Sequence, residues 1–331
     1  MNGILNINKA TGMTSHDVVA KIRRLLKEKR VGHAGTLDPA ASGVLPICVG
    51  QATRVAEYLS DSGKAYLATI LFGTVTDTYD AEGTILRTLS TDGLILQSVE
   101  DALEHFLGPQ MQVPPRYSAI KLQGQPAYKR TRSGEDITLP PRPIVIYALQ
   151  ISSWNPPFVT LAIECGKGTY IRSLAYDLGE YLGCGASLHS LVRTRSGPFL
   201  LSESITLDQL TDALTVQTAQ GSDGKEPLSD HENSPLQEGV EPLNDLKNSP
   251  LHSLSQFLYP ADKALEHYPA LKVDAVTVER VLHGNAFNYP HGVNMTQADN
   301  VARVYSDDGH FIAIAGWDAE QEVWKPKKVF I

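Results

Sequence analysis

The chain has 331 residues, of which 42% are hydrophobic and 20% charged, a balance typical of a globular protein long enough for two domains. It has no apolar run of 18 residues, no secretory signal pattern and only three widely separated cysteines. We therefore expect neither a membrane protein nor a disulfide framework or structural zinc site, and the expected compartment is the cytoplasm. The net charge of −8 does not exclude nucleic acid, because residues 1–200 carry 20 Lys and Arg against 17 Asp and Glu.

Apolar periodicity predicts a mixture of helices and strands. The segment TSHDVVAKIRRLLKE at 14–28 predicts a helix with Thr14 or Ser15 as its N-cap, one apolar face and one basic face. Further helices are expected at 52–61, 99–108, 168–183 and 276–287. Strands are expected at 2–9, 44–50, 64–73, 143–151, 158–166, 301–309, 310–318 and 323–331. Since helices and strands do not alternate regularly, we expect an α+β fold with an antiparallel or mixed sheet.

Residues 212–256 differ from the rest of the chain. They carry eight acids against two lysines and repeat EPLSDHENSPL (226–236) as EPLNDLKNSPL (241–251). Two polar copies are too few for a solenoid, so the composition predicts an acidic, disordered insertion or linker that catalysis does not need. It would separate a domain at 1–211 from a small β-rich domain at 257–331, whose first residues could belong to the first domain.

Two basic segments are candidates for RNA contact. KIRRLLKEKR (21–30) clusters its charges, and RYSAIKLQGQPAYKRTRSG (116–134) combines Lys and Arg with two tyrosines and no acid. This composition suits contacts to phosphates and bases. Each segment alone could equally be a solvated surface.

The candidate reacting groups are separated polar residues in apolar surroundings. Common nucleotide-binding, hydrolase and zinc-protease motifs are missing, so we expect no metal and no cofactor. Asp38 lies in the loop GHAGTLDPAASG, Tyr66 in an expected strand, and Arg172 near the start of an expected helix. A loop carboxylate beside a helical guanidinium could form an oriented, charge-assisted pair. Read singly, the three residues could also be a turn cap, a core residue and a surface ion-pair partner.

Six blocks within residues 2–200 together carry a resemblance to a known family. They are NKATGMTSHDVV, VGHAGTLDPAASGVLPICVGQATR, KAYLATILFGTVTDTYDAEG, PPRYSAIKLQGQPAYKRTRSGE, KGTYIRSLAYDLG and LVRTRSGPF. In this order they resemble the bacterial tRNA pseudouridine-55 synthase family, and the C-terminal segment resembles the PUA-type RNA-binding module of that family. The resemblance implies a monomeric enzyme that isomerises uridine 55 in the T-loop of tRNA to pseudouridine without a metal or cofactor.

The resemblance also implies roles for seven residues. Asp38 matches the catalytic aspartate, and Arg172 matches the arginine that pairs with it. The other matches are to substrate-binding residues: Tyr66 stacking on the target base, Tyr170 as a second active-site tyrosine, Leu191 lining the pocket, His33 holding the T-loop open, and Lys9 near the site. Ala10 follows Lys9 where the family usually has proline, so that turn is expected to be less rigid.

Isomerisation of a nucleoside explains this choice of residue types. One glycosidic bond breaks, the uracil turns and a carbon–carbon bond forms, so one carboxylate suffices, either to attack the nucleoside or to remove a ribose proton. Flipping the uridine costs a few kcal/mol, of which an aromatic face such as Tyr66 recovers roughly 1–3 kcal/mol. Two alternatives stay open: a non-catalytic RNA-binding or folding factor, and a nucleosidase-like hydrolase that releases free uracil.

Overall fold

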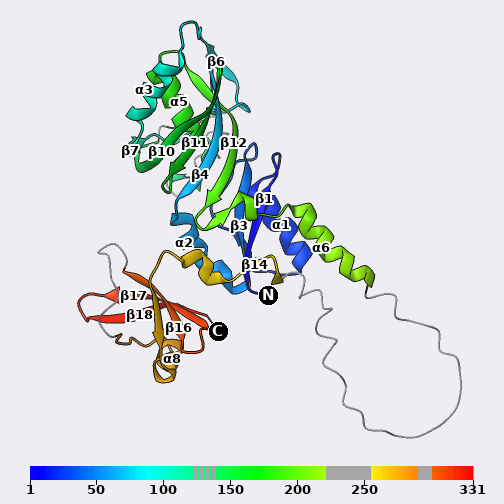
Figure 1. The fold of residues 1–331 in the computed structure, drawn as a ribbon, viewed down its shortest axis with the longest axis vertical. Coiled ribbons are helices and arrows are strands. Elements are labelled where there is room, and N and C mark those ends of the chain that lie inside the picture. The colour runs from blue at the N-terminus through cyan, green and yellow to red at the C-terminus, as the bar shows by residue number, and fades with distance from the viewer. Residues whose placement is uncertain are drawn as a thin grey trace, which may run out of the picture.

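The computed structural model describes residues 1–118, 139–220, 255–289 and 300–330, together with 120–122, 125–126, 130, 135 and 137. Figure 1 shows a large twisted sheet with helices packed on it and a smaller sheet, built from the C-terminal residues, beside its lower end. The mixed sheet and its helices confirm the predicted α+β class. Across these residues no helix is both long and apolar enough to cross a membrane.

The large sheet has ten strands. They are β1 (Gly3–Lys9), β2 (Val31–His33), β3 (Ser42–Val49), β4 (Lys64–Phe72), β7 (Gly108–Gln112), β10 (Arg142–Asn155), β11 (Phe158–Cys165), β12 (Ala186–Ser196), β13 (Phe199–Leu200) and β14 (Leu258–Tyr259). Their order is β14-β1-β3-β12-β4-β11-β10-β7, with β2 on β3 and β13 on β12. Neighbouring strands run antiparallel except β3 and β12, which run parallel.

Helices and short hairpins complete the larger part of the molecule. The helices are α1 (Ser15–Leu26), α2 (Ala56–Asp61), α3 (Leu96–His105), α5 (Ile171–Tyr181) and α6 (Leu207–Gln220), with 3-10 turns η1 (Gly50–Val55) and η2 (Leu201–Glu203). The hairpins pair β5 (Thr74–Thr76) with β6 (Ile85–Thr88) and β8 (Lys121–Leu122) with β9 (Gln125–Pro126). Three expected helices need correction. The segment expected at 276–287 is helical only over Ala275–Leu282, and Phe287 forms a β-bridge with Trp324. The segment 52–61 begins as the 3-10 turn η1. The segment 99–108 starts earlier and ends at His105, because Gly108 already pairs in the sheet with Ile146.

Helix α1 begins where the sequence predicts. Thr14 is its N-cap, and the Thr14 side chain accepts a hydrogen bond from the amide of Asp17 while the Asp17 carboxylate accepts one from the Thr14 amide. This reciprocal pair satisfies two amides that the helix leaves free. Val18, Val19 and Ile22 face the core and are buried, so the charged residues of α1 lie on the outside. The helix therefore packs its apolar stripe on the sheet, as its periodicity predicts.

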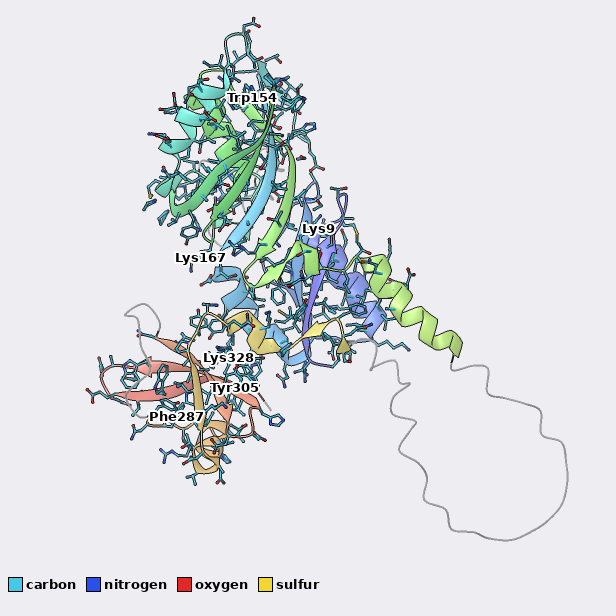
Figure 2. All side chains as sticks on the ribbon, in the orientation of Figure 1. Lys9, Trp154, Lys167, Phe287, Tyr305 and Lys328 are labelled. Carbon is cyan, nitrogen blue, oxygen red and sulfur yellow. The ribbon has the colours of Figure 1, made fainter. Side chains whose placement is uncertain are left out.

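The smaller sheet is formed by β15 (Ala270–Val273), β16 (Val301–Ser306), β17 (Phe311–Asp318) and β18 (Val323–Val329), with α8 (Ala275–Leu282) beside it and η4 (Ala261–Leu265) before it. It contacts η1 and α2, where the ammonium of Lys328 pairs with Glu57 and donates to the carbonyl of Arg54 at 2.7 Å. In return Arg54 donates to the carbonyl of Val329. Figure 2 shows Lys328 at this junction.

The expected linker lies mostly outside the described residues. Helix α6 continues to Gln220, so the first residues of the 212–256 segment are helical, and 221–254 are not described. Strand β14 pairs with β1, so residues 258–259 join the large sheet although the linker precedes them. The division into domains at 211 and 257 stays a prediction.

Candidate active site

The Asp38 loop lies where β3 and β12 meet. These strands pair over two positions, Val192 with Ser42 and Arg193 with Gly43, and the loop enters β3 at this point. Gly43 has a φ of 102°, and a Cβ atom on it would lie 2.3 Å from the carbonyl oxygen of Arg193. Only glycine combines this backbone conformation with so close an approach. The junction therefore fixes the base of the loop against β12.

Two buried cations and a serine hold the loop in shape. The Ser15 hydroxyl donates to the carbonyl of Leu37 at 3.1 Å and accepts from the Leu37 amide at 2.9 Å. The guanidinium of Arg193, 1% exposed, donates to three carbonyls, those of Gly35, Thr36 and Val44. The ammonium of Lys9, fully buried, also donates to three carbonyls, those of Ala10, Met13 and Pro39. A loop tied at so many backbone atoms can present Asp38 with little reorganisation.

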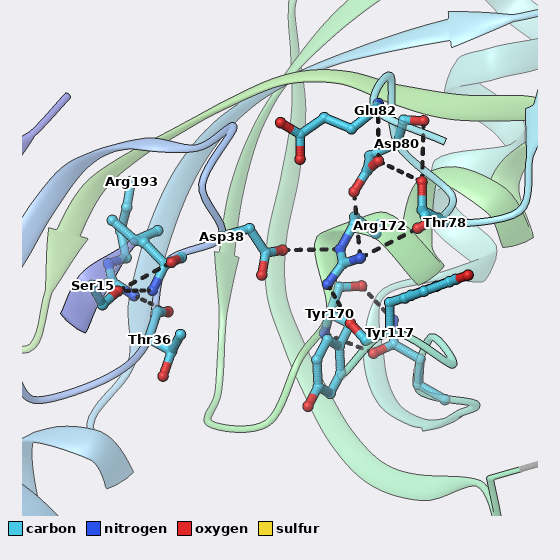
Figure 3. A network of polar contacts seen from close by, with 12 residues as sticks. Ser15, Thr36, Asp38, Thr78, Asp80, Glu82, Tyr117, Tyr170, Arg172 and Arg193 are labelled. Carbon is cyan, nitrogen blue, oxygen red and sulfur yellow. Dashed lines mark hydrogen bonds and ion pairs between the residues drawn. The ribbon is translucent and has the colours of Figure 1, made fainter. Parts of the chain in front are cut away.

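Arg172 joins the Asp38 loop to a second acidic residue. Its Nε lies 2.9 Å from Oδ2 of Asp38, and its Nη1 lies 3.3 Å from Oδ2 of Asp80. Nη1 also donates to the carbonyl of Thr78 and Nη2 to that of Tyr117, at 3.3 and 3.1 Å. Figure 3 shows this guanidinium between the two carboxylates. The ion pair expected between Asp38 and Arg172 is therefore present, and Arg172 is held on all its nitrogen atoms.

The sequence interpretation missed Asp80 and Arg193. Asp80 is buried; its Oδ1 accepts hydrogen bonds from the hydroxyl of Thr78 at 2.5 Å and the amide of Glu82 at 3.1 Å, which leaves Oδ2 for Arg172. Both missed residues lie inside blocks that carry the family resemblance, TDTYDAEG and LVRTRSG. The available signal was that each is a charged residue within such a block. Their roles could not be read from the sequence, because the Arg172 guanidinium and the loop carbonyls that they contact are distant in the chain.

Asp38, Arg172 and Leu191 line one small hollow of about 20 Å³. Its other lining residues are Ala40, Ala41, Asp80, Ala81, Leu188, His189 and Ser190. The side chain of Asp38 is 42% exposed, whereas that of Arg172 is 8% exposed. The carboxylate is therefore open to a ligand from the side opposite the guanidinium. A carboxylate held in this way can act as a nucleophile or as a base.

The two predicted tyrosines lie near the hollow but not on its lining. Tyr170 is the residue before α5, and Gln112 bonds both its amide and its carbonyl, at 2.8 and 3.0 Å. Figure 3 shows its ring beside Arg172, and burial raises the pKa of its hydroxyl. Tyr66 on β4 pairs across the strands with Arg193 and is 9% exposed, and burial raises its pKa as well. With so little free ring surface in this structure, the stacking role of Tyr66 stays a prediction.

Lys9 and His33 lie away from the lining of the hollow. The contacts of Lys9 are with backbone carbonyls, so its observed part is to shape the loop rather than to face a ligand. His33, on β2, packs edge-on against His16 of α1, with ring centroids 5.2 Å apart. Burial lowers the pKa of His33, and its buried Nδ1 has no hydrogen-bond partner among the described residues.

The buried charge of Lys9 predicts a pH-dependent stability. Burial lowers the pKa of Lys9 from 10.5 to about 8. Between these values the unfolded chain holds a proton that the folded chain has released, so stability increases as the pH rises through this range. Relative to Lys9→Met, the free energy of unfolding of the wild type should increase over this pH range by about 1.4 kcal/mol for each unit between the unfolded-state and folded-state pKa values of Lys9. Urea unfolding of both proteins at about pH 7 and pH 10.5 measures the gain.

Lys64 provides an independent repeat of this measurement. Its ammonium donates to the carbonyls of Ser60 and Ser62, both at 2.6 Å, and burial lowers its pKa to about 8. Relative to Lys64→Met, the free energy of unfolding of the wild type should therefore also increase as the pH rises. A difference between wild type and Lys9→Met that stays constant with pH would contradict the buried-charge interpretation.

The fold recurs in solved structures of protein complexes. One crystal structure, described as a Cbf5-Nop10-Gar1 complex, superposes with a TM-score of 0.73 over 99% of this chain and 85% of that chain, at 25% identity. A structure of an H/ACA RNP bound to a substrate RNA shares the fold, with a TM-score of 0.70 at 24% identity over 99% of this chain and 85% of that one. This chain therefore has the fold of these proteins, and its site holds a loop aspartate paired with a helical arginine.

Sequence comparisons identify the family. The family described as TruB family pseudouridylate synthase (N-terminal domain) matches residues 23–171, and the tRNA pseudouridylate synthase B C-terminal domain matches 172–266. Proteins named tRNA pseudouridine synthase B are 38% identical in Dehalococcoides mccartyi (all of this chain, 97% of that one) and 39% identical in Clostridium kluyveri (95% of each). One from Symbiobacterium thermophilum is 48% identical over 63% of this chain and 71% of its own. The chain belongs to the TruB family of pseudouridylate synthases.

Proposed function

We propose that this enzyme isomerises uridine 55 in the T-loop of tRNA to pseudouridine. The observation that carries the proposal is the exposed Asp38 carboxylate held by the buried Arg172 in the hollow beside β12. Family membership and the printed names of the relatives, tRNA pseudouridine synthase B, support tRNA as the substrate. No second function has a comparable site among the described residues.

The reaction assigns a task to each group around the hollow. Asp38 meets the flipped nucleoside and either attacks it or removes a ribose proton, and Arg172 orients the carboxylate. Leu191 supplies an apolar wall beside the base. Tyr170 and Tyr66 contact the base from the α5 and β4 sides, and His33 acts on the RNA loop that the uridine leaves. Deuterium at C2′ of the ribose separates the two roles of Asp38, because only removal of that proton breaks the labelled bond and shows a primary isotope effect.

The remaining parts of the molecule serve RNA binding in this proposal. The outer face of α1 carries Arg23 and Arg24, which are exposed and suit phosphate contacts. The small sheet of β15–β18 is the PUA-like module, and the catalytic domain comprises residues 1–211 together with β14. The enzyme acts in the cytoplasm as a monomer, with no metal.

Tritium release tests the proposed function directly. A T-arm stem-loop carrying uridine with tritium at C5 loses the label to water when a carbon–carbon bond forms at C5. We expect the wild-type chain to release the label and leave a pseudouridine in the RNA, which nuclease digestion and chromatography identify. Free uracil among the products would instead indicate a hydrolase. RNA binding without release would indicate a non-catalytic binding protein.

A further inference from the structure

The turn that holds Arg172 contains a tyrosine in an unusual backbone conformation. Tyr79 has a φ of 64°, a left-handed value that non-glycine residues rarely adopt. Two other described non-glycine residues have positive φ: Lys27 ends helix α1, and Glu322 lies in the turn between β17 and β18. Positive φ is ordinary at such positions. Tyr79 also lies in a turn, between β5 and β6, but it is a bulky aromatic residue and its turn contacts Arg172. Strain kept in a turn beside the Asp38–Arg172 pair points to a function for that turn.

Both neighbours of Tyr79 contact the arginine of the site. The carbonyl of Thr78 accepts from Nη1 of Arg172 at 3.3 Å, and the carboxylate of Asp80 lies 3.3 Å from the same nitrogen. The backbone at Tyr79 sets the angle between these two groups. A change of φ at Tyr79 therefore moves one or both away from the guanidinium.

A ring stack holds Tyr79 in place. Its ring lies on that of Tyr176, with centroids 4.1 Å apart and an interplanar angle of 20°. Tyr176 is on α5 four residues after Arg172, so both side chains project from the same face of the helix. One helix face therefore contacts one turn in two ways: Arg172 through polar groups and Tyr176 through an aromatic face.

Hydrogen bonds to β12 fix the other side of the turn. The carbonyl of Tyr79 accepts from the amide of Leu188 at 2.9 Å, and the amide of Ala81 donates to the carbonyl of Leu188 at 3.0 Å. These bonds set where the turn lies, but they leave the ring of Tyr79 free to rotate about its own bonds. The stack on Tyr176 adds a side-chain contact that opposes relaxation of the left-handed backbone, beside the hydrogen bonds from the Tyr79 amide to the carbonyl of Thr76 at 3.3 Å and from the Thr76 hydroxyl to the carbonyl of Asp80 at 2.7 Å.

We infer that Tyr79 and Tyr176 form a positioning pair for the reaction: their ring stack keeps the Thr78–Asp80 turn on Arg172, and Arg172 in turn aims Asp38. The two tyrosines act through Arg172 and need no contact with the RNA. This inference rests on the proposed function. Loss of either ring lets the turn relax and Arg172 shift, so the carboxylate is aimed less well while the RNA-binding surface is unchanged.

The test compares ring removal with ring retention. Tyr79→Ala and Tyr176→Ala should each lower kcat for tritium release by about 10- to 100-fold, a loss typical of a misplaced catalytic group, while the KM for tRNA stays within about twofold. Tyr79→Phe and Tyr176→Phe keep the stack and should retain the wild-type kcat. The double variant Tyr79→Ala, Tyr176→Ala should be no slower than either single variant, because both lose the same contact.

A second stack on the same helix is the matched control. Tyr181 of α5 stacks on His105 of α3, with centroids 4.8 Å apart and an angle of 22°, and neither residue lines the hollow. Tyr181→Ala should leave kcat unchanged. Tyr79→Gly removes the ring but accepts a positive φ without strain, so it provides a folded protein if Tyr79→Ala does not fold. Because glycine also lets the backbone move to other conformations and no ring stack then opposes this, its kcat should also fall.

The outcomes separate this inference from the proposed function. A wild-type protein that releases no tritium overturns the proposed function, and the positioning role falls with it. An active wild type with full kcat in both Tyr79→Gly and Tyr176→Ala overturns the positioning role alone. Equal losses in Tyr176→Ala and Tyr181→Ala would also overturn it, because the effect would then belong to α5 in general.

Discussion

Replacing Asp38 with asparagine is expected to lower the rate of tritium release by about 10³-fold or more. The side chain keeps its size and can still contact Arg172, but an amide can neither attack a nucleoside nor take up a proton. Because Asp38 is 42% exposed and its loop is tied at backbone atoms, the fold and the affinity for tRNA should change little. Single-turnover tritium release and filter binding measure the two quantities.

Asp61 provides a matched control for this variant. It too is an aspartate paired with a cation, Lys167, at 2.8 Å, but its side chain is 60% exposed and it does not line the hollow. Asp61→Asn should therefore retain the wild-type rate. If Asp38→Asn released tritium at the wild-type rate, the carboxylate would not be the reacting group and the proposed mechanism would fail.

Local patterns predicted much of the framework of the fold. Helix α1 has a cap and an apolar stripe, and β1, β4, β10 and β11 are rich in β-branched and aromatic residues, so their elements can be read from short windows. The four-stranded C-terminal sheet was predicted in three of its strands for the same reason. Such elements are determined largely by residues that are neighbours in sequence.

The strand at the centre of the site could not be predicted in this way. Strand β12, with the sequence ASLHSLVRTRS, pairs with both β3 and β4, yet its apolar and polar residues do not alternate cleanly. Two register shifts of β12 against β4, at Leu188–Ser190 and Arg193–Arg195, interrupt the alternation. Arg193 is 1% exposed because the carbonyls of a distant loop surround it. A buried arginine in a strand becomes interpretable only when those partners are known.

The resemblance paired Arg172 with Asp38, but it placed Lys9 only near the site and did not single out Arg193. Lys9, Arg193 and Arg172 are three buried cations around one loop. Lys9 and Arg193 are bound to backbone carbonyls, so they define the path of the loop. Arg172 also contacts the Asp38 carboxylate, which makes it the cation coupled to the group that we propose reacts. Spacing in the sequence carries no information on this difference, because it depends on which atoms lie within hydrogen-bond distance.

Arg172 should therefore be needed for both stability and catalysis. Arg172→Met leaves the carboxylate of Asp80, 12% exposed, without its cation, and this should lower the free energy of unfolding by about 3 kcal/mol. The pair with the exposed Asp38 adds little to stability, because solvent screens it. The rate of tritium release should fall by about 10²-fold or more, since nothing then orients Asp38. Arg195, paired at 2.9 Å with the exposed Glu164, is the control, and Arg195→Met should cost less than about 1 kcal/mol.

A second substitution separates the two parts of this loss. In Arg172→Met, Asp80→Asn the buried charge is removed together with its partner, so urea unfolding should show a large part of the lost stability restored. Tritium release should stay as low as in Arg172→Met, because Asp38 still has no cation behind it. Recovery of the rate along with the stability would show that Arg172 only supports the fold. Recovery of stability alone would establish that the guanidinium acts on the carboxylate itself.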